Sequence, residues 1–318
     1  MTYKKFSLLL LFMFISFALG ESACEAQAAF FQGAELQFGS GYRSGKLDWN
    51  IAGPGDTPDV LSELDWEDLD IFQTKAESQV WFASAYWPVL SLCLKGSVAY
   101  GWIVDGNNRD SDYAGDHRTL EFSRSENSGD GGNVLDLSIA AGPQFKLWQG
   151  KITIALLAGW SYHEQNLEIS EGQQTIAVDP DDLGPFPGLD SSYDTKWWGP
   201  WLGTDLNWQL GERFTLSGAF AWHFADYEAK ADWNLRDDLA HPVSFRHYAD
   251  GHGLTLGLGL AYQLNNDWML ELSYDYQNWQ ADDGNSYTYA ASGGSGRTRL
   301  NEVNWRSQSV LLNLGYRF

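Results

Sequence analysis

Several long segments of this 318-residue chain alternate apolar and polar residues with a period of two. The last segment is the clearest. Its apolar set is Val310, Leu312, Leu314, Tyr316 and Phe318, and its intervening set is Ser309, Asn313, Gly315 and Arg317. Successive side chains of a β-strand point to opposite sides, so this pattern predicts a strand with one apolar and one polar face. Segments around 214–224 and 254–264 repeat the pattern over more residues than a strand of a soluble protein normally has.

Ten such segments can be counted along the chain. Their approximate ranges are 31–43, 62–88, 90–105, 132–147, 151–169, 193–209, 213–230, 243–264, 267–289 and 299–318. Short turns and long polar loops alternate between them, as in outer-membrane barrels with tight periplasmic turns and longer extracellular loops. We therefore expect an all-β protein, a ten-stranded antiparallel transmembrane β-barrel with both chain ends on the periplasmic side.

The composition narrows the alternatives. A net charge of −22 disfavours a nucleic-acid partner, because it repels phosphate. A soluble sandwich would also alternate, but it rarely needs 16 Trp and 15 Tyr, whereas the aromatic girdles of a membrane barrel do. Ten strands are too few for a wide aqueous pore. A narrow channel stays open as a third class, because the polar-side residues Ser217, Ala219, Gly257 and Gly259 are small.

The first residues resemble an export signal. Lys4 and Lys5 precede an apolar run over 6–19, which is too short for a spanning helix and typical of a secretory signal peptide. Cleavage is possible after Gly20 or after Ala28, and small residues at both required positions favour the second. The expected organisation is a signal peptide over 1–28 and a single barrel domain over 29–318, in the outer membrane of a Gram-negative-type cell.

Two irregularities are expected within the strands. The segment 62–88 is too long for one regular strand, which predicts a bulge around 67–74. In the seventh segment the even-numbered residues are apolar up to Phe224, yet Asp226 and Glu228 are also even. Either a bulge near Ala225 turns the later residues toward the lumen, or they stand above the bilayer, where the alternation is not enforced.

Several motifs, in this order, resemble those of the omptin family of outer-membrane proteases. They are Ser62-Glu63-Leu64-Asp65-Trp66, Asp110-Ser111-Asp112-Tyr113, Leu183-Gly184-Pro185-Phe186-Pro187 and Gly199-Pro200-Trp201-Leu202-Gly203. The resemblance covers nearly the whole mature chain and implies a ten-stranded barrel. In omptins an Asp pair faces an Asp-x-His dyad, and a water between them attacks the peptide.

The resemblance assigns catalytic positions to Asp110, Asp112, Asp232 and Asn234. Asn234 stands where the family has the dyad histidine, and an amide cannot accept and return a proton near neutral pH. The substrate-binding positions fall on Lys230, where the family has an acidic residue, and on Asp48. Lys230 would repel a basic substrate side chain.

Other histidines could replace the missing base. His241 lies in the same loop as Asn234 and is the strongest alternative, whereas His247 lies at the start of the next strand and His117 lies on the loop of the Asp pair. His163, His223 and His252 lie on strands and are expected to be wall or lumen residues.

These features predict an omptin-like outer-membrane barrel that is proteolytically impaired and serves as a surface binding or structural protein. The alternative is an active omptin-type endoprotease with a displaced general base. Outer-membrane lipid, including lipopolysaccharide, and peptides or proteins at the extracellular mouth are the expected partners. No cofactor and no metal site are expected, and the acidic loops, such as Asp179, Asp181 and Asp182, are interpreted as solvated surface.

Overall fold

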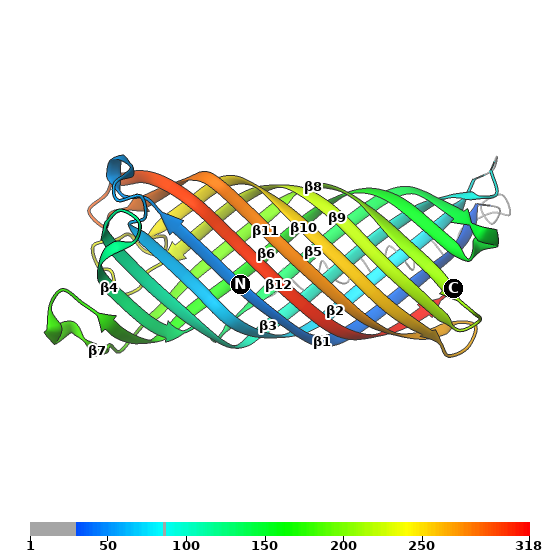
Figure 1. The fold of residues 1–318 in the computed structure, drawn as a ribbon, viewed down its shortest axis with the longest axis horizontal. Coiled ribbons are helices and arrows are strands. Elements are labelled where there is room, and N and C mark those ends of the chain that lie inside the picture. Colours follow the sequence, from blue (N-terminus) through cyan, green and yellow to red (C-terminus); the bar gives the residue numbers. More distant parts are fainter. Residues whose placement is uncertain (1–29, 85–86) are drawn as a thin grey trace.

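A computed structural model describes residues 30–84 and 87–318. The long strands run steeply inclined around one axis (Figure 1). They are β1 (Phe31–Ile51), β2 (Ser62–Ala83), β3 (Leu90–Gly115), β5 (Gly132–Leu147), β6 (Ile152–Ile176), β8 (Asp190–Leu210), β9 (Phe214–Asp232), β10 (Phe245–Gln263), β11 (Trp268–Tyr289) and β12 (Ser295–Arg317). Two short strands, β4 (Thr119–Ser128) and β7 (Gly184–Pro185), lie at the same end of the barrel (Figure 1).

The strands close into an antiparallel ring of ten positions. β1 pairs with both β2 and β12, which joins the two ends of the sheet. β4 and β5 share one position in the ring. β4 pairs with residues 107–115 of β3 and 170–176 of β6, and β5 pairs with residues 90–102 and 152–167 of the same two strands. The break between β4 and β5 contains Gly131 and Gly132, whose φ angles of 97° and 80° favour glycine.

The expected ten-stranded barrel is therefore confirmed, with longer strands than the sequence suggested. β1 continues to Ile51 and β3 to Gly115, beyond the predicted ends at 43 and 105. The expected irregularity in β2 is present: Gly45 faces Leu69 while Leu47 faces Trp66, so Glu67 and Asp68 form a bulge. The predicted signal peptide over 1–28 lies outside the described residues.

The outer surface is divided along the barrel axis. Toward the tight turns it is a band of exposed apolar side chains, including Leu216, Leu258 and Leu312. Aromatic side chains lie at both edges of this band, as expected at the two membrane interfaces. At the edge near the turns they include Trp148, Trp208, Phe214, Trp268 and Phe318, and at the opposite edge Tyr42, Phe72, Trp102, Trp160 and Phe224. Because outer-membrane barrels have short periplasmic turns and longer extracellular loops, the end with the tight turns is assigned to the periplasm. No helix in the described part of the chain is long and apolar enough to span a membrane.

The polarity of the lumen changes along the axis in the direction opposite to that of the outer surface. Its extracellular half is filled by fully buried aromatic and aliphatic side chains, among them Trp66, Trp197, Trp279, Trp305 and Tyr193. At the middle, Arg43 pairs with Asp136 at 2.6 Å, and Nδ1 of His163 lies 2.7 Å from the same carboxylate. Below this layer the lumen is polar and contains a cavity. The structure therefore has a core in its extracellular half and a hydrated interior in its periplasmic half.

Candidate functional site

The mouth of the barrel contains Asp110 and Asp112 near the end of β3. Asp110 accepts a hydrogen bond from the indole of Trp233, whose ring packs edge-on against Phe245 of the lumen core at 4.7 Å. Asp112 interacts with the hydroxyl of Ser62. Both carboxylates therefore lie on the lumen side, and the structure brings this predicted pair together.

Burial dominates the electrostatics of this pair. It raises the pKa of Asp110 well above its ordinary value, and the neighbouring charge of Asp112 acts in the same direction, while the hydrogen bond from Trp233 opposes both. The pKa of Asp112 is also raised, mainly by burial. Oδ1 of Asp110 is buried and has no hydrogen-bond partner among the described residues. Such a pair favours holding a proton rather than two charges.

Asp232 lies at the end of β9 and faces away from the lumen. The alternation of β9 continues without a register shift against both β8 and β10. Ala229 and Ala231 consequently lie in the lumen core, and Lys230 and Asp232 point outward. Of the two alternatives for this strand, the bulge near Ala225 is therefore wrong. The upper part of β9 stands above the apolar band, where outward-facing residues meet water rather than lipid.

Lys230 follows the same alternation. Its Nζ lies 2.9 Å from Oδ2 of Asp194 on the outer side of β8. Its charge is thus partly neutralised on the wall, away from the carboxylates of the mouth.

His241 is the partner that the structure gives to Asp232. Its Nδ1 lies 2.6 Å from Oδ1 of Asp232. The pKa of His241 is raised, chiefly by this hydrogen bond, because the carboxylate stabilises the protonated ring. The imidazole lines an open hollow on the outer side of the loop together with Arg246 and Tyr289. A carboxylate–imidazole pair therefore exists, although with a different spacing from Asp-x-His.

Asn234 connects two extracellular segments. Its Nδ2 donates to the carbonyl of Gly188 at 2.7 Å, and its Oδ1 accepts from the backbone N–H of Asp190 at 2.9 Å and from Oγ of Ser191 at 3.0 Å. Both ends of the amide are thus used to hold the segment before β8 against the loop after β9. These contacts need an amide, which both donates and accepts.

Trp233 separates the two predicted groups of catalytic residues. It lies between Asp232 and Asn234 in the sequence, points to the lumen and contacts Asp110. The structure therefore assembles Asp110 with Asp112, and Asp232 with His241, but places the first pair inside the mouth and the second on the outer side of the wall. Two residues of the site were not identified from the sequence: Trp233, and Arg236, whose positive charge acts on both mouth aspartates. Their position in the loop that contains the matched dyad was the available signal.

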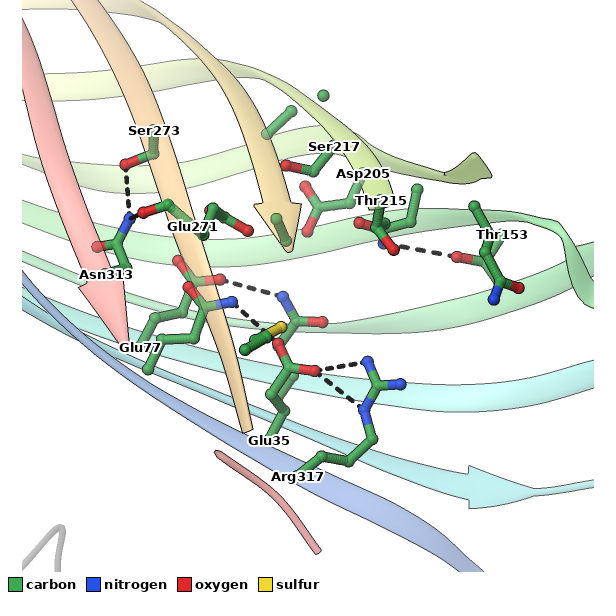
Figure 2. A pocket seen from close by; sticks show the side chains of 18 of the residues that line it. Glu35, Glu77, Thr153, Asp205, Thr215, Ser217, Glu271, Ser273, Asn313 and Arg317 are labelled. Atoms are coloured by element: carbon green, nitrogen blue, oxygen red, sulfur yellow. Dashed lines mark hydrogen bonds and ion pairs between the residues drawn. The ribbon is translucent and has the colours of Figure 1, made fainter. Parts of the chain in front are cut away.

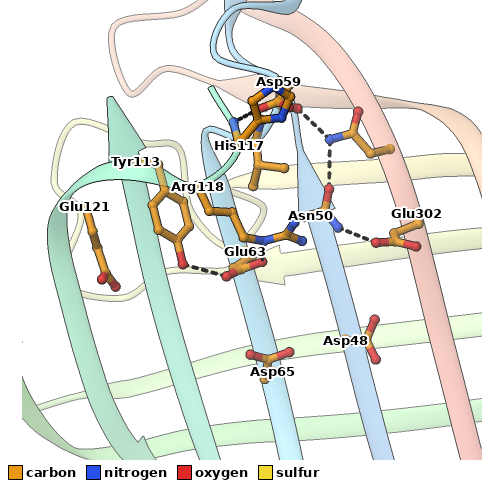
Figure 3. A network of polar contacts seen from close by, with 12 residues as sticks. Asp48, Asn50, Asp59, Glu63, Asp65, Tyr113, His117, Arg118, Glu121 and Glu302 are labelled. Atoms are coloured by element: carbon orange, nitrogen blue, oxygen red, sulfur yellow. Dashed lines mark hydrogen bonds and ion pairs between the residues drawn. The ribbon is translucent and has the colours of Figure 1, made fainter. Parts of the chain in front are cut away.

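Asp48 lies on the outer wall, outside the lumen. It faces Asp65 on β2 in register (Figure 3). It also accepts a hydrogen bond of 2.7 Å from Nδ2 of Asn304. Burial raises its pKa. The surrounding network, in which the hydroxyl of Tyr113 donates to Glu63 at 2.6 Å, joins β1, β2 and β3 on the same face (Figure 3). The structure does not bring Asp48 to the mouth aspartates.

The remaining histidines have structural surroundings. His163 and His223 are buried in the lumen, and Nδ1 of His223 lies 2.9 Å from Oγ of Ser161. His247 is also buried, with Nδ1 at 2.9 Å from the hydroxyl of Tyr193. His252 stacks on Trp222 on the outer surface. Among the described residues, no group of three His, Cys, Asp or Glu side chains is arranged to hold a metal ion.

Comparison with known proteins identifies relatives of the fold. The family described as Pom, Protochlamydia outer membrane protein, matches residues 37–318. The outer-membrane protease OmpT from Escherichia coli is similar in structure, with a TM-score of 0.72 over 94% of this chain and 99% of that chain, at 14% identity. At this identity the likeness concerns the fold alone. No curated protein sequence matches the chain.

Two further solved barrels match less well. The translocator domain of the autotransporter NalP from Neisseria meningitidis is 11% identical over 95% of this chain and 92% of that chain, with a TM-score of 0.33. Ail from Yersinia pestis, solved with a heparin analogue, is 12% identical over 90% of this chain and 99% of that chain, with a TM-score of 0.27. At these TM-scores neither match supports an inference about this chain.

Proposed function

The chain belongs to the Pom family of outer-membrane proteins, and from this premise we propose that it is an omptin-like surface barrel that does not cleave peptides and serves as a binding or structural protein. The observation that carries the proposal is the placement of Asp232 and His241 on the outer side of the wall, with Trp233 between them and Asp110. An omptin-like reaction needs these groups to face one another across a single water.

The missing base strengthens this proposal. Transfer of a proton to a positioned base contributes about 10²–10⁴-fold to the rate of such reactions. Asn234 stands at the matched position, and its amide is occupied by contacts to Gly188 and Asp190. The mouth carboxylates are also half-buried, and Oδ1 of Asp110 is buried without a hydrogen-bond partner among the described residues.

The alternative is an active endoprotease that uses His241 as a displaced base. The 2.6 Å contact with Asp232 favours it, because a carboxylate orients the imidazole in many such dyads. Two observations oppose it. The imidazole faces outward, and its raised pKa reduces the fraction of the neutral form that could accept a proton.

Binding would take place outside the bilayer. The apolar band contacts outer-membrane lipid, and lipopolysaccharide is the expected lipid at its extracellular edge. Above this edge the loops are acidic, with Asp179, Asp181 and Asp182 exposed on the segment that precedes β7. A concentrated negative potential of this kind favours cationic peptides or protein surfaces as ligands of the mouth.

A peptide-cleavage assay in outer-membrane lipid tests the proposal. Peptides with dibasic sites are incubated with the wild type, Asn234→His, the double variant Asn234→His/Lys230→Asp and His241→Ala. Asp110→Ala is the blank, and OmpT is the positive control. We expect the wild type to equal the blank and Asn234→His to show at most partial cleavage. Brisk wild-type cleavage that is lost in His241→Ala would replace the proposal with the displaced-base protease.

A further inference from the structure

A cavity of about 460 Å³ occupies the periplasmic half of the lumen (Figure 2). Its lower rim is formed by residues of the tight turns, such as Gly150 and Arg213, so it opens toward the periplasm. The cavity exists because its walls are unequal. Small residues such as Ser217, Ala219 and Gly257 on β9 and β10 face long charged side chains on the other strands. Its volume lies in the range typical of small-molecule sites.

The cavity is lined by six carboxylates and six cations, but these charges are unevenly distributed between its interior and its rim. Lys75 pairs with Asp275 at 3.2 Å, Lys95 with Asp205 at 2.7 Å, and both lysines approach Glu77. At the rim, Arg317 pairs with Glu35 at 2.6 Å. Lys75, Lys95 and Arg317 are therefore already engaged with carboxylates.

Glu271 is the carboxylate that remains. It lines the cavity from β11, and it has no ion pair within the described part of the chain. Figure 2 shows its side chain on the same side of the cavity as Glu77 and Glu35. Away from the rim the cavity is lined by four carboxylates and two cations, whereas the rim has two carboxylates and four cations. The interior residues are Glu77, Asp205, Glu271, Asp275, Lys75 and Lys95, and the rim residues are Glu35, Glu212, Lys146, Lys151, Arg213 and Arg317. An unmatched charge inside a barrel wall is poorly screened, which favours a cationic occupant.

The neutral polar groups point to the same chemistry. Nε2 of Gln37 donates to Glu35 at 2.9 Å, and Nε2 of Gln79 donates to Glu77 at 3.0 Å. Each amide donates one N–H to a carboxylate and keeps its second N–H and its carbonyl oxygen. These carbonyl oxygens, together with the carboxylate of Glu271, are acceptors for the N–H groups of an ammonium.

A metal ion fits this site poorly, because no three ligating side chains come together among the described residues and the cavity is far larger than an ion. We propose that the cavity is a periplasm-facing binding site for a small organic amine, with Glu271 as the carboxylate that receives an ammonium group. This site is separate from the mouth, and the inference does not depend on the function proposed above.

Calorimetric titration of the folded full-length barrel in detergent at low salt tests the proposal, with the diamine putrescine as the probe. Glu271→Gln keeps the shape and removes the charge, and we expect at least about tenfold weaker binding. Ala219→Leu adds an apolar side chain to the small wall and keeps every charge, and we expect a similar loss. Asp250→Asn is the matched control, because it removes one carboxylate from the exposed outer wall.

The control separates the cavity from general attraction to an acidic protein. If Asp250→Asn weakens binding as much as Glu271→Gln, or if Ala219→Leu binds as the wild type does, the proposal is overturned. An absence of putrescine binding to the folded wild type also overturns it. A shift on heating in gel electrophoresis confirms that each variant is folded, and Ala219→Leu keeps the test decisive if Glu271→Gln does not fold.

Discussion

In both halves of the barrel successive residues of a strand face outward and inward in turn. The outward-facing residues are apolar in the periplasmic half and polar in the extracellular half, and the inward-facing residues show the reverse. In the periplasmic half of β9, Phe220 and Trp222 are exposed on the outside while Ser217 lines the cavity. In the extracellular half, Lys230 is outside while Ala229 lies in the aromatic core. The strand direction and register do not change between these halves. The surroundings of the strand, lipid or water, therefore decide which of its faces must be apolar.

β9 has no bulge near Ala225, and the alternative in which its later residues stand above the bilayer holds instead. The acidic residues that begin at Asp226 break the apolar pattern on the outer face because the strand leaves the bilayer after Phe224. The change from lipid to water along the outer face therefore produces the same sequence pattern as a one-residue bulge would. Four measurements test this difference between the two halves of the barrel.

The largest effect is expected from Trp197→Ala in the extracellular core. Trp197 is fully buried, packs against Tyr227 at 4.3 Å and donates from Nε1 to Gln165 at 3.1 Å. Its loss should lower the free energy of unfolding by about 3–5 kcal/mol, measured by urea unfolding in phospholipid vesicles. Trp208→Ala on the outer surface is the control and should cost clearly less. Equal costs would show that the extracellular half has no core of its own.

The next effect compares the outer faces of the two halves. Leu258→Arg places a charge in the middle of the apolar band and should cost about 2–4 kcal/mol. Asp226→Arg makes an equally large change above the band, where Asp226 faces Asp250 in register. Relief of this like-charge pair should leave the stability unchanged or slightly higher. A large loss in Asp226→Arg would place the lipid boundary higher than the structure does.

A smaller effect is expected at the mouth. The folded pKa of Asp110 is raised, so its carboxyl contributes stability while it is neutral, below its unfolded pKa, and this contribution is lost as the pH rises through the folded pKa. Asp110→Asn removes the ionisation and should stabilise the protein more at pH 8 than at pH 4. The exposed Asp283→Asn is the control. A pH-independent difference would mean that Asp110 is not held in a protonating environment.

The smallest effect concerns the outward pair. NMR titration of His241 should show a pKa above the ordinary value for histidine, and Asp232→Asn should return it toward that value, because the carboxylate is the main cause of the shift. Asp238→Asn changes another acid of the same loop and should leave the titration of His241 nearly unchanged. If Asp238→Asn moves it as far as Asp232→Asn does, the shift belongs to the general field of the loop.

Much of the barrel could be predicted from the sequence. The alternation of β12 and the tight turns predicted a ten-stranded ring, and the excess length of the second segment predicted the bulge that the structure places at Glu67 and Asp68. β4 was missed, because its polar residues do not show an apolar face. The positions of Asp110 and Asp112 at the mouth were also expected, although they lie within β3 rather than in a loop.

The arrangement of the candidate site could not be predicted in the same way. The strand count, the lipid-facing residues and the presence of an amide rather than an imidazole at Asn234 could be read from the sequence alone, because each follows from local alternation or from the identity of one residue. Only the tertiary structure decided that His241 contacts Asp232, that both lie outside the wall and that Trp233 fills the space beside Asp110. These relations depend on how a closed sheet brings distant strands and loops together, and on where the bilayer ends, which no local pattern of residues encodes.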